Sequence, residues 1–195
     1  MDLYLVRHAP VNLESTVCYG QLNVQTDSTF DDVCLSLTPL FKKLENSKVY
    51  SSPLNRCALM AQYFFDEFSV VNDLMEINFG DWEGIPWDHI PRIEIDKWVD
   101  DISDFKPNNG ESLREMHQRV VKFVNYVILQ NQKSVILFTH AGPIRSILAH
   151  YLGIDFRETL KIQIDYSSIS KINIQKEIIR VEFINRLSGS INEWV

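Results

Sequence analysis

Two apolar runs, far apart in the sequence, each lead directly into a histidine. Leu3–Val6 is followed by Arg7 and His8, and Val135–Phe138 is followed after one residue by His140. A short, uninterrupted apolar run is typical of a buried strand. In an open α/β sheet, ligands bind at the carboxyl ends of the strands. We therefore expect both imidazoles in one crevice. The alternative is that these polar residues merely cap strand ends at the surface.

The residues after each run favour a sharp change of direction. Pro10 cannot continue a strand ladder. Gly142 permits a tight turn, and Pro143 is well suited to be the first residue of a helix. A helix that begins there would present unpaired backbone N–H groups to an anion. The second histidine is therefore expected beside a potential anion site.

A third apolar strand, predicted over 48–51, leads to an arginine. Ser52 is a good helix N-cap and Pro53 a good first helical residue. Arg56 then falls on the first turn, at the end that faces the strand tips. The planar guanidinium group of arginine matches phosphate or carboxylate. Arg7 and Arg56 are thus candidates to bind the same anion.

Strand and helix patterns alternate along the chain, which predicts an α/β fold with a three-layer α/β/α sandwich. Helices are expected at 30–44, 53–67, 85–102, 112–130 and 143–152, and further strands at 69–71, 169–174 and 178–184. Pro39 predicts a kink or two short helices in the first of these. Ser112 and Glu115 have capping-box spacing. Residues 11–27 are expected to form a long loop that either walls a pocket or simply connects elements.

Composition limits the classes of function. The chain has 195 residues, 45% of them hydrophobic, and a formal net charge of −7. This predicts a single globular domain over 1–195 and disfavours nucleic acid or an anionic membrane as partner. The first residues show no secretory signal pattern. Cys18, Cys34 and Cys57 lack metal or redox spacing and are expected to be reduced thiols, as in a cytoplasmic protein.

Four motifs together resemble the histidine phosphatase superfamily, the phosphoglycerate mutase-like group. They are Arg7-His8, Ser52-Pro53-Leu54-x-Arg56, Glu76 within 74–84, and Thr139-His140-Ala141-Gly142. The motifs occur in the family's order and cover the chain from its start to about residue 142. The resemblance implies a mixed, mostly parallel sheet with the site at its carboxyl edge. Two positions depart from the family's usual glycine, Ala9 and Ala141, and Asn12 is the candidate replacement for the family's threonine near the first motif.

The resemblance also implies the chemistry. His8 would attack phosphorus and form a phosphohistidine, while its other ring nitrogen would need a backbone acceptor. Arg7, Arg56 and His140 would hold the phosphate oxygens. Glu76 would protonate the leaving oxygen and then activate water. Asp81 and Glu83 are the rival acids. Further substrate contacts are expected from Asn12, Gln21, Glu111 and Ala141, whereas His89, His117 and His150 are interpreted as ordinary helix residues.

Within the superfamily, three segments look most like α-ribazole phosphatases: 18–21, 76–83 and 109–112. This implies hydrolysis of α-ribazole 5′-phosphate, or of adenosylcobalamin 5′-phosphate, in cobalamin biosynthesis. The alternatives are a broad-specificity phosphatase, a phosphoglycerate mutase-type enzyme, and a non-catalytic phosphate-binding module. A small phosphorylated substrate is expected as partner, with no metal and no cofactor, and a homodimer is left open.

Overall fold

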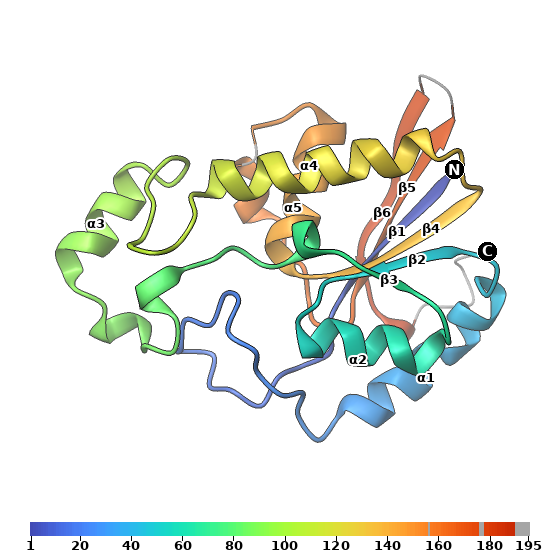
Figure 1. Ribbon diagram of the computed structural model, residues 1–195, viewed down its shortest axis with the longest axis horizontal. Helices are drawn as coiled ribbons and strands as arrows, with labels where there is room; N and C mark the ends of the chain where they lie inside the picture. The colour runs from blue at the N-terminus through green and yellow to red at the C-terminus, as the bar shows by residue number, and fades with distance from the viewer. Residues whose placement is uncertain (156, 176–177, 190–195) are drawn as a thin grey trace.

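The computed structural model describes residues 1–155, 157–175 and 178–189, and its centre is a six-stranded mixed sheet (Figure 1). The strand order is β3-β2-β4-β1-β5-β6. The strands are β1 (Asp2–Arg7), β2 (Lys48–Ser51), β3 (Ser69–Val70), β4 (Ser134–Thr139), β5 (Ile169–Gln175) and β6 (Ile178–Arg186). Residues 190–195 of the predicted 1–195 domain lie outside the described residues.

Parallel pairing brings three strand ends to one level. β1 and β2 flank β4, and both run parallel to it. Arg7 is paired with Thr139, and Ser51 is paired with Phe138. The residues that follow these strands, including His8 and His140, therefore leave the sheet at the same edge. β5 is antiparallel to β1, and β6 is antiparallel to β5, which confirms the mixed, mostly parallel sheet.

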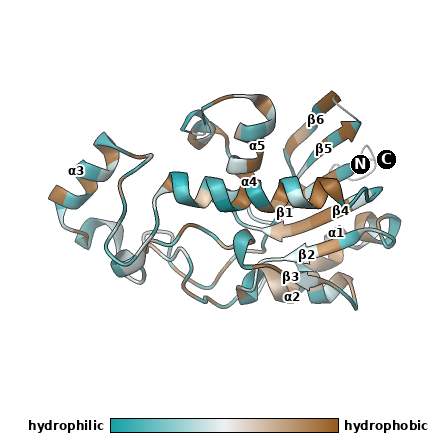
Figure 2. Cartoon of the chain, turned by 45° about the horizontal axis from the view of Figure 1, so that its top comes forward, coloured by the Kyte–Doolittle hydropathy of each residue, from teal (hydrophilic) through white to brown (hydrophobic). Residues whose placement is uncertain are grey.

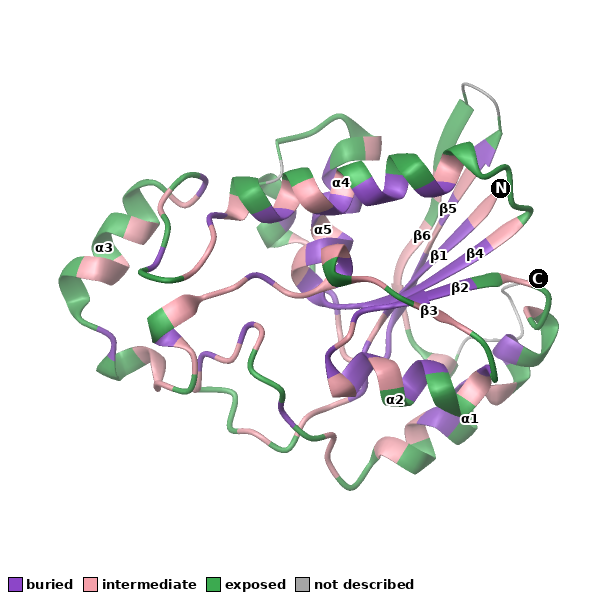
Figure 3. Ribbon diagram, in the orientation of Figure 1, coloured by how far each residue is buried: buried purple, intermediate pink, exposed green. Residues whose placement is uncertain are grey.

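Helices cover both faces of the sheet, as a three-layer sandwich requires. The helices are α1 (Phe30–Lys43), α2 (Asn55–Phe64), α3 (Arg92–Asp100), α4 (Leu113–Leu129) and α5 (Ala141–Leu152). Alternate residues of β1 divide between two cores: Leu3 and Leu5 pack with α4 and α5, while Tyr4 and Val6 pack with α1 and α2. Period-two alternation explains this division. Figure 3 shows the central strands β1, β2 and β4 largely buried, the edge strand β6 more exposed, and the outer sides of the helices exposed. Figure 2 shows hydrophobic and hydrophilic residues alternating along α4.

The helices that contain or follow three prolines differ from their predicted form. α1 is one continuous helix through Pro39, so the expectation of two short helices is wrong. The exposed Leu35 lies four residues earlier, where water can replace the hydrogen bond that proline cannot make. α2 begins after Pro53, with Leu54 as N-cap. α5 begins at Ala141, two residues before Pro143. Proline is tolerated there because first-turn N–H groups lack helical partners anyway.

The predicted helical insertion at 85–102 is only partly helical. It contains a 3-10 turn at Trp87–His89 and then α3. Together, residues 79–105 form an aromatic lobe that projects from the sheet and carries α3 at its far side (Figure 1). Trp82 and Ile90 are its buried centre, against which Trp87, Trp98 and Phe105 pack. The lobe therefore has a small apolar core of its own.

The remaining elements agree with the sequence patterns. β5 and β6 pair antiparallel and correspond to the two strands expected over 169–174 and 178–184. The other 3-10 helices are η1 (Asn72–Leu74), η2 (Gly80–Trp82) and η4 (Glu158–Lys161). In the described part of the chain, none of the helices has the length and apolar character that crossing a bilayer needs.

The predicted capping box of α4 is present. Glu115 N donates to Ser112 Oγ at 3.2 Å, and Ser112 N donates to Glu115 Oε2 at 2.8 Å. We expect Ser112→Ala to lower the free energy of unfolding by about 1 kcal/mol, because one first-turn N–H loses its partner. Urea unfolding measures this. Ser36→Ala on the exposed side of α1 is the control and should change stability by less than about 0.5 kcal/mol. Equal losses in both variants would contradict the capping role.

Candidate active site

His8 is the first residue after β1, and its side chain is held in one orientation. The residue is 1% exposed. Its Nδ1 lies 2.7 Å from the carbonyl oxygen of Ala9. Because a carbonyl can only accept, Nδ1 carries the proton and Nε2 keeps a lone pair. The ring thus has the backbone acceptor that a nucleophilic imidazole was expected to need.

His140 is the N-cap of α5, and its ring lies beside that of His8. The two ring centroids are 5.0 Å apart. Arg56 Nε donates to His140 Nδ1 at 3.2 Å. His140 Nδ1 is therefore an acceptor, and the opposite nitrogen, Nε2, donates to Ser52 Oγ at 2.9 Å. Strand ends that are distant in the sequence thus meet, as their parallel pairing requires.

Two guanidinium groups lie at the same edge of the sheet. Arg56 is fully buried and donates to the carbonyls of Leu22 at 2.8 Å and Gly20 at 2.6 Å. Arg7 donates to the carbonyl of Ile164 at 2.5 Å, and its guanidinium carbon lies 3.8 Å from the ring centroid of Tyr166. All these partners are neutral, so the contacts orient the two positive charges without cancelling them.

The two histidines are neutral in this setting. Burial lowers the pKa of His8 well below its usual value, and the charges of Arg56 and Arg7 lower it further. Burial also lowers the pKa of His140 well below its usual value, and His8 and Arg56 lower it further. The positive charge of the site therefore resides on the arginines. His140 is accordingly a neutral imidazole that donates from Nε2.

Glu76 lies between η1 and the aromatic lobe, with its carboxylate against the N-terminus of α5. Gly142 N donates to Glu76 Oε2 at 3.2 Å, and Ile77 N donates to Oε1 at 3.0 Å. A Cβ atom at position 142 would collide with Glu76 Oε1. Glycine at this position therefore lets the carboxylate approach closely, since an added Cβ would displace it. The glycine does not make a tight turn, because residue 142 is helical.

The two rival acids have other partners. Glu83 Oε1 accepts from Gln21 N at 2.8 Å and from Phe79 N at 3.0 Å, and burial raises its pKa. Asp81 is bonded by the side-chain amides of Asn108 and Asn109, which lower its pKa. Neither carboxylate lines the cavity described below, whereas Glu76 does.

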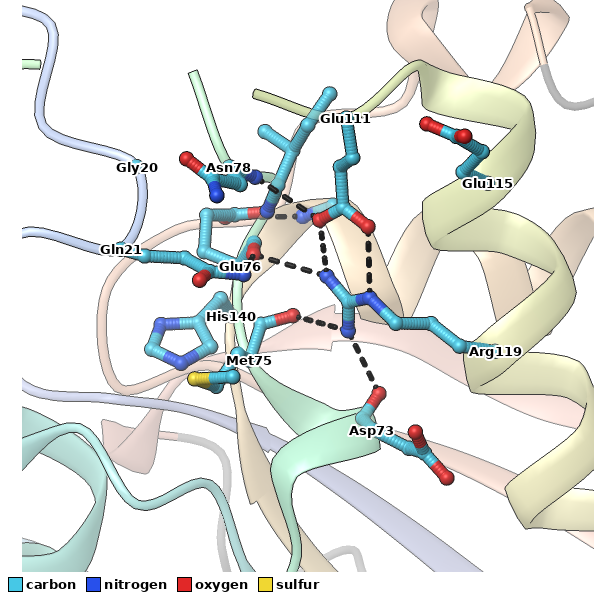
Figure 4. A network of polar contacts seen from close by, with 12 residues as sticks. Gly20, Gln21, Asp73, Met75, Glu76, Asn78, Glu111, Glu115, Arg119 and His140 are labelled. Carbon is cyan, nitrogen blue, oxygen red and sulfur yellow. Dashed lines mark hydrogen bonds and ion pairs between the residues drawn. The ribbon is translucent and has the colours of Figure 1, made fainter. Parts of the chain in front are cut away.

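Arg119, on α4, holds the backbone that carries Glu76 (Figure 4). It donates to the carbonyls of Asp73 at 2.8 Å, Met75 at 2.8 Å and Glu76 at 2.9 Å. It also makes a bidentate ion pair with Glu111, at 2.6 and 3.0 Å. The side chains of this pair are only 19% and 15% exposed. The loop is thus tied to a helix by one side chain.

The other predicted substrate contacts are placed as follows. Gln21 Nε2 donates to the Glu76 carbonyl at 2.9 Å. Glu111 is engaged by Arg119, and its Oε1 also accepts from Asn78 N at 2.9 Å. Ala141 is the first residue of α5 and is buried. Asn12 is exposed and lines a separate, open depression. Their roles in substrate binding stay predictions.

A cavity of about 280 Å³ adjoins Glu76 and Gly142. Residues 15, 17, 19 and 20 line it, so the long loop does wall a pocket, as one of the two sequence interpretations expected. Arg145 was not predicted from the sequence. It lines the cavity from α5 and donates to the carbonyl of Ile162 at 3.0 Å. Its position three residues after Gly142 is the only local signal that could have identified it.

Comparisons with known proteins identify the family and the fold. The histidine phosphatase superfamily (branch 1) matches residues 3–186. The putative phosphoserine phosphatase 2 of Hydrogenobacter thermophilus is 25% identical over 95% of each chain. The adenosylcobalamin/alpha-ribazole phosphatase of Escherichia coli is 21% identical over 95% of this chain and 96% of its own. A crystal structure of a putative alpha-ribazole-5′-P phosphatase from E. coli superimposes with a TM-score of 0.86 at 20% identity, covering 95% of this chain and 96% of that one. The chain described here therefore belongs to the histidine phosphatase superfamily, and it is a phosphatase of that group.

Proposed function

We propose that the chain hydrolyses a phosphomonoester through a phosphohistidine formed on His8. The observation that carries this proposal is the convergence of His8, His140, Arg7 and Arg56 at one edge of the sheet, with His8 Nε2 unprotonated. A neutral imidazole supplies the nucleophile, and two guanidinium groups supply the charge that phosphate oxygens need. The proposal depends on all four residues together, because none of them alone indicates a phosphatase.

The reaction has two balanced steps. In the first, the lone pair of His8 Nε2 attacks phosphorus, the bond to the leaving oxygen breaks, and Glu76 gives its proton to that oxygen. In the second, the Glu76 carboxylate takes a proton from water, the resulting hydroxide oxygen bonds to phosphorus, and the P–N bond breaks to restore the imidazole. Each well-placed donor on the phosphate oxygens contributes roughly 3 kcal/mol to such transition states.

For the substrate, we favour α-ribazole 5′-phosphate or its adenosylcobalamin form. Support comes from the motifs at 18–21, 76–83 and 109–112 and from the likeness to the E. coli adenosylcobalamin/alpha-ribazole phosphatase. Phosphoserine is the second candidate, since relatives bearing that activity in their names are 25% and 26% identical. A cytoplasmic location, a homodimer and the lack of nucleic-acid and membrane partners stay predictions from the sequence.

Trapping the phosphoenzyme tests the mechanism. Intact-protein mass spectrometry after an alkaline quench should detect one added phosphoryl group in the wild type and none in His8→Ala, which should also lose turnover. With Glu76→Gln, phosphorylation by ethyl phosphate should slow by about 100-fold or more, because its alkoxide needs a proton. Phosphorylation by p-nitrophenyl phosphate should slow far less.

The outcomes separate the alternatives. An equal effect of Glu76→Gln on both substrates would contradict its role as the acid. Turnover that survives in His8→Ala would contradict its role as the nucleophile. Absence of both turnover and phosphoenzyme in the wild type would favour a non-catalytic phosphate-binding module. Interconversion of phosphoglycerates without phosphate release would indicate a mutase.

The neutral histidines also predict a pH-dependent stability. The folded-state pKa values of His8 and His140 are depressed, so below pH 6.5 the unfolded chain binds more protons than the folded one. Stability is thus complete above about pH 6.5 and decreases as the pH falls. Between pH 7.5 and 5.5, the free energy of unfolding should drop by up to about 1.4 kcal/mol for each histidine that stays neutral when folded.

Urea unfolding in a buffer without phosphate measures this decrease. His8→Gln removes one titrating group and should reduce the pH dependence of stability relative to the wild type. A protein whose stability is identical at both pH values would contradict the assigned neutral states.

A further inference from the structure

The cavity beside Glu76 has a largely apolar lining, and the proposed reaction would place the leaving group of the substrate in it. We call it the leaving-group cavity. Phe79, Trp87, Trp98 and Ile102 of the aromatic lobe form one side, and Leu113 and Leu160 from the body form another. Glu76 also lines it, together with Gly142, whose N–H donates to the Glu76 carboxylate. Since Glu76 must reach the leaving oxygen to protonate it, the rest of the leaving group extends into this space.

The aromatic wall is already packed. The rings of Trp87 and Trp98 are stacked, with centroids 5.8 Å apart and planes 14° from parallel. Phe79 meets both edge-on, at 5.4 Å and 6.1 Å. Behind them, Trp82 is 3% exposed and donates from Nε1 to Glu94 Oε2 at 2.6 Å. The wall therefore offers flat apolar surfaces that do not have to be assembled when substrate arrives.

Charge is scarce in the cavity. Of the residues that line it, Glu76 and Arg145 carry charged side chains. Arg145 is oriented by its bond to the Ile162 carbonyl. Away from these two side chains, a small zwitterionic leaving group would place charged atoms against tryptophan and leucine, where they lose hydration. A flat ring system gains stacking and burial at the same surface.

We propose that this cavity selects phosphomonoesters whose leaving group carries an aromatic or heteroaromatic ring, with Trp87 and Trp98 as specificity-determining residues. The inference rests on the proposed function and narrows its substrate class. A benzimidazole nucleoside such as α-ribazole belongs to that class, and serine and glycerate do not.

Two alkyl phosphates of similar leaving-group basicity isolate the effect of the ring. Benzyl phosphate and ethyl phosphate both release a primary alcohol, so their difference reports binding in the cavity more than chemistry. We expect kcat/KM to be about tenfold or more higher for benzyl phosphate, from stacking and apolar burial. Phosphoserine and α-ribazole 5′-phosphate complete the panel, and the second should be preferred.

Variants of the aromatic residues test whether they cause the preference for benzyl phosphate. Trp98→Leu should lower the benzyl-to-ethyl ratio severalfold, whereas Trp98→Phe should retain most of it. Trp82→Phe is the matched control, because Trp82 belongs to the same lobe and loses a hydrogen bond but does not line the cavity. It should lower the melting temperature and leave the ratio unchanged. An unchanged ratio in a folded Trp98→Leu protein would overturn the assignment.

The outcomes distinguish the cavity proposal from the proposed phosphatase function on which it rests. Turnover with a benzyl-to-ethyl ratio near one, or a preference for phosphoserine, would overturn the cavity proposal while the phosphohistidine mechanism stands. Absence of both turnover and phosphoenzyme for every ester would overturn the proposed function itself.

A separate observation, the polar network on α4, carries a second inference. We infer that Arg119 is a positioning residue for Glu76, acting through the backbone on its N-terminal side. One guanidinium group bonds three carbonyls between 73 and 76 while its charge is compensated by Glu111. Glu111 in turn accepts from Asn78 N, on the other side of Glu76. A lysine ammonium has only three N–H donors and cannot reproduce this set of contacts.

Kinetics of the phosphorylation step test this inference. Misplacement of Glu76 in Arg119→Lys should slow phosphorylation by ethyl phosphate by about 10- to 100-fold and affect p-nitrophenyl phosphate less. Arg114→Gln is the control, since Arg114 lies on the same helix and makes a bidentate pair with Asp104, at 2.5 and 2.8 Å, that is half exposed. It should leave both rates unchanged. Equal slowing of both esters in Arg119→Lys, accompanied by a lower melting temperature, would show a merely structural role and overturn the inference.

Discussion

The pairing of β1 with β4 determines where the chemistry can take place. Register sets Arg7 opposite Thr139, so the next residue of each strand is a histidine at the same height. Side chains alternate between the two faces of a strand, and a slip of one residue would turn one imidazole away from the other. The apolar residues of both strands are buried on both faces, which specifies that register strongly. The hydrophobic core and the placement of the two histidines are thus set by the same contacts.

Burial then determines the protonation of the site. An imidazolium at His8 would lose hydration and would also face the charges of Arg56 and Arg7, and both effects oppose protonation. The guanidinium groups can stay charged in the same surroundings because arginine holds its proton far more strongly and because backbone carbonyls accept their N–H groups. The same arrangement therefore keeps the nucleophilic imidazole unprotonated and surrounds it with positively charged guanidinium groups.

The parts of this structure that sequence patterns predicted are those with local signals. Uninterrupted apolar runs marked β1 and β4, and Ser112 with Glu115 marked the start of α4 correctly. Helix starts next to prolines were wrong because Pro53 and Pro143 fit several positions near a first turn. Arg119 was missed because the carbonyls to which it donates lie 43 to 46 residues away, and a solitary arginine on an amphipathic helix has the appearance of a surface charge. The long loop was ambiguous for the same reason: the bonds that tie it to the site come from distant residues, as those from Arg56 to the carbonyls of Gly20 and Leu22 and from Gln21 to the Glu76 carbonyl show.

The two halves of the site differ in how they are built, and the difference has a physical basis. The phosphate side is assembled from strand ends and helix starts, whose geometry is dictated by the ladder and cannot shift without cost to the core. The leaving-group side is lined by the aromatic lobe, whose Trp82 and Ile90 form a small apolar cluster with Cys18, and by residues of the long loop, α4 and α5. Substitutions in the lobe can therefore alter which leaving group fits while the charges around phosphorus stay in place. The proposed specificity-determining residues, Trp87 and Trp98, thus lie in the lobe and apart from the strand ends that hold His8 and His140.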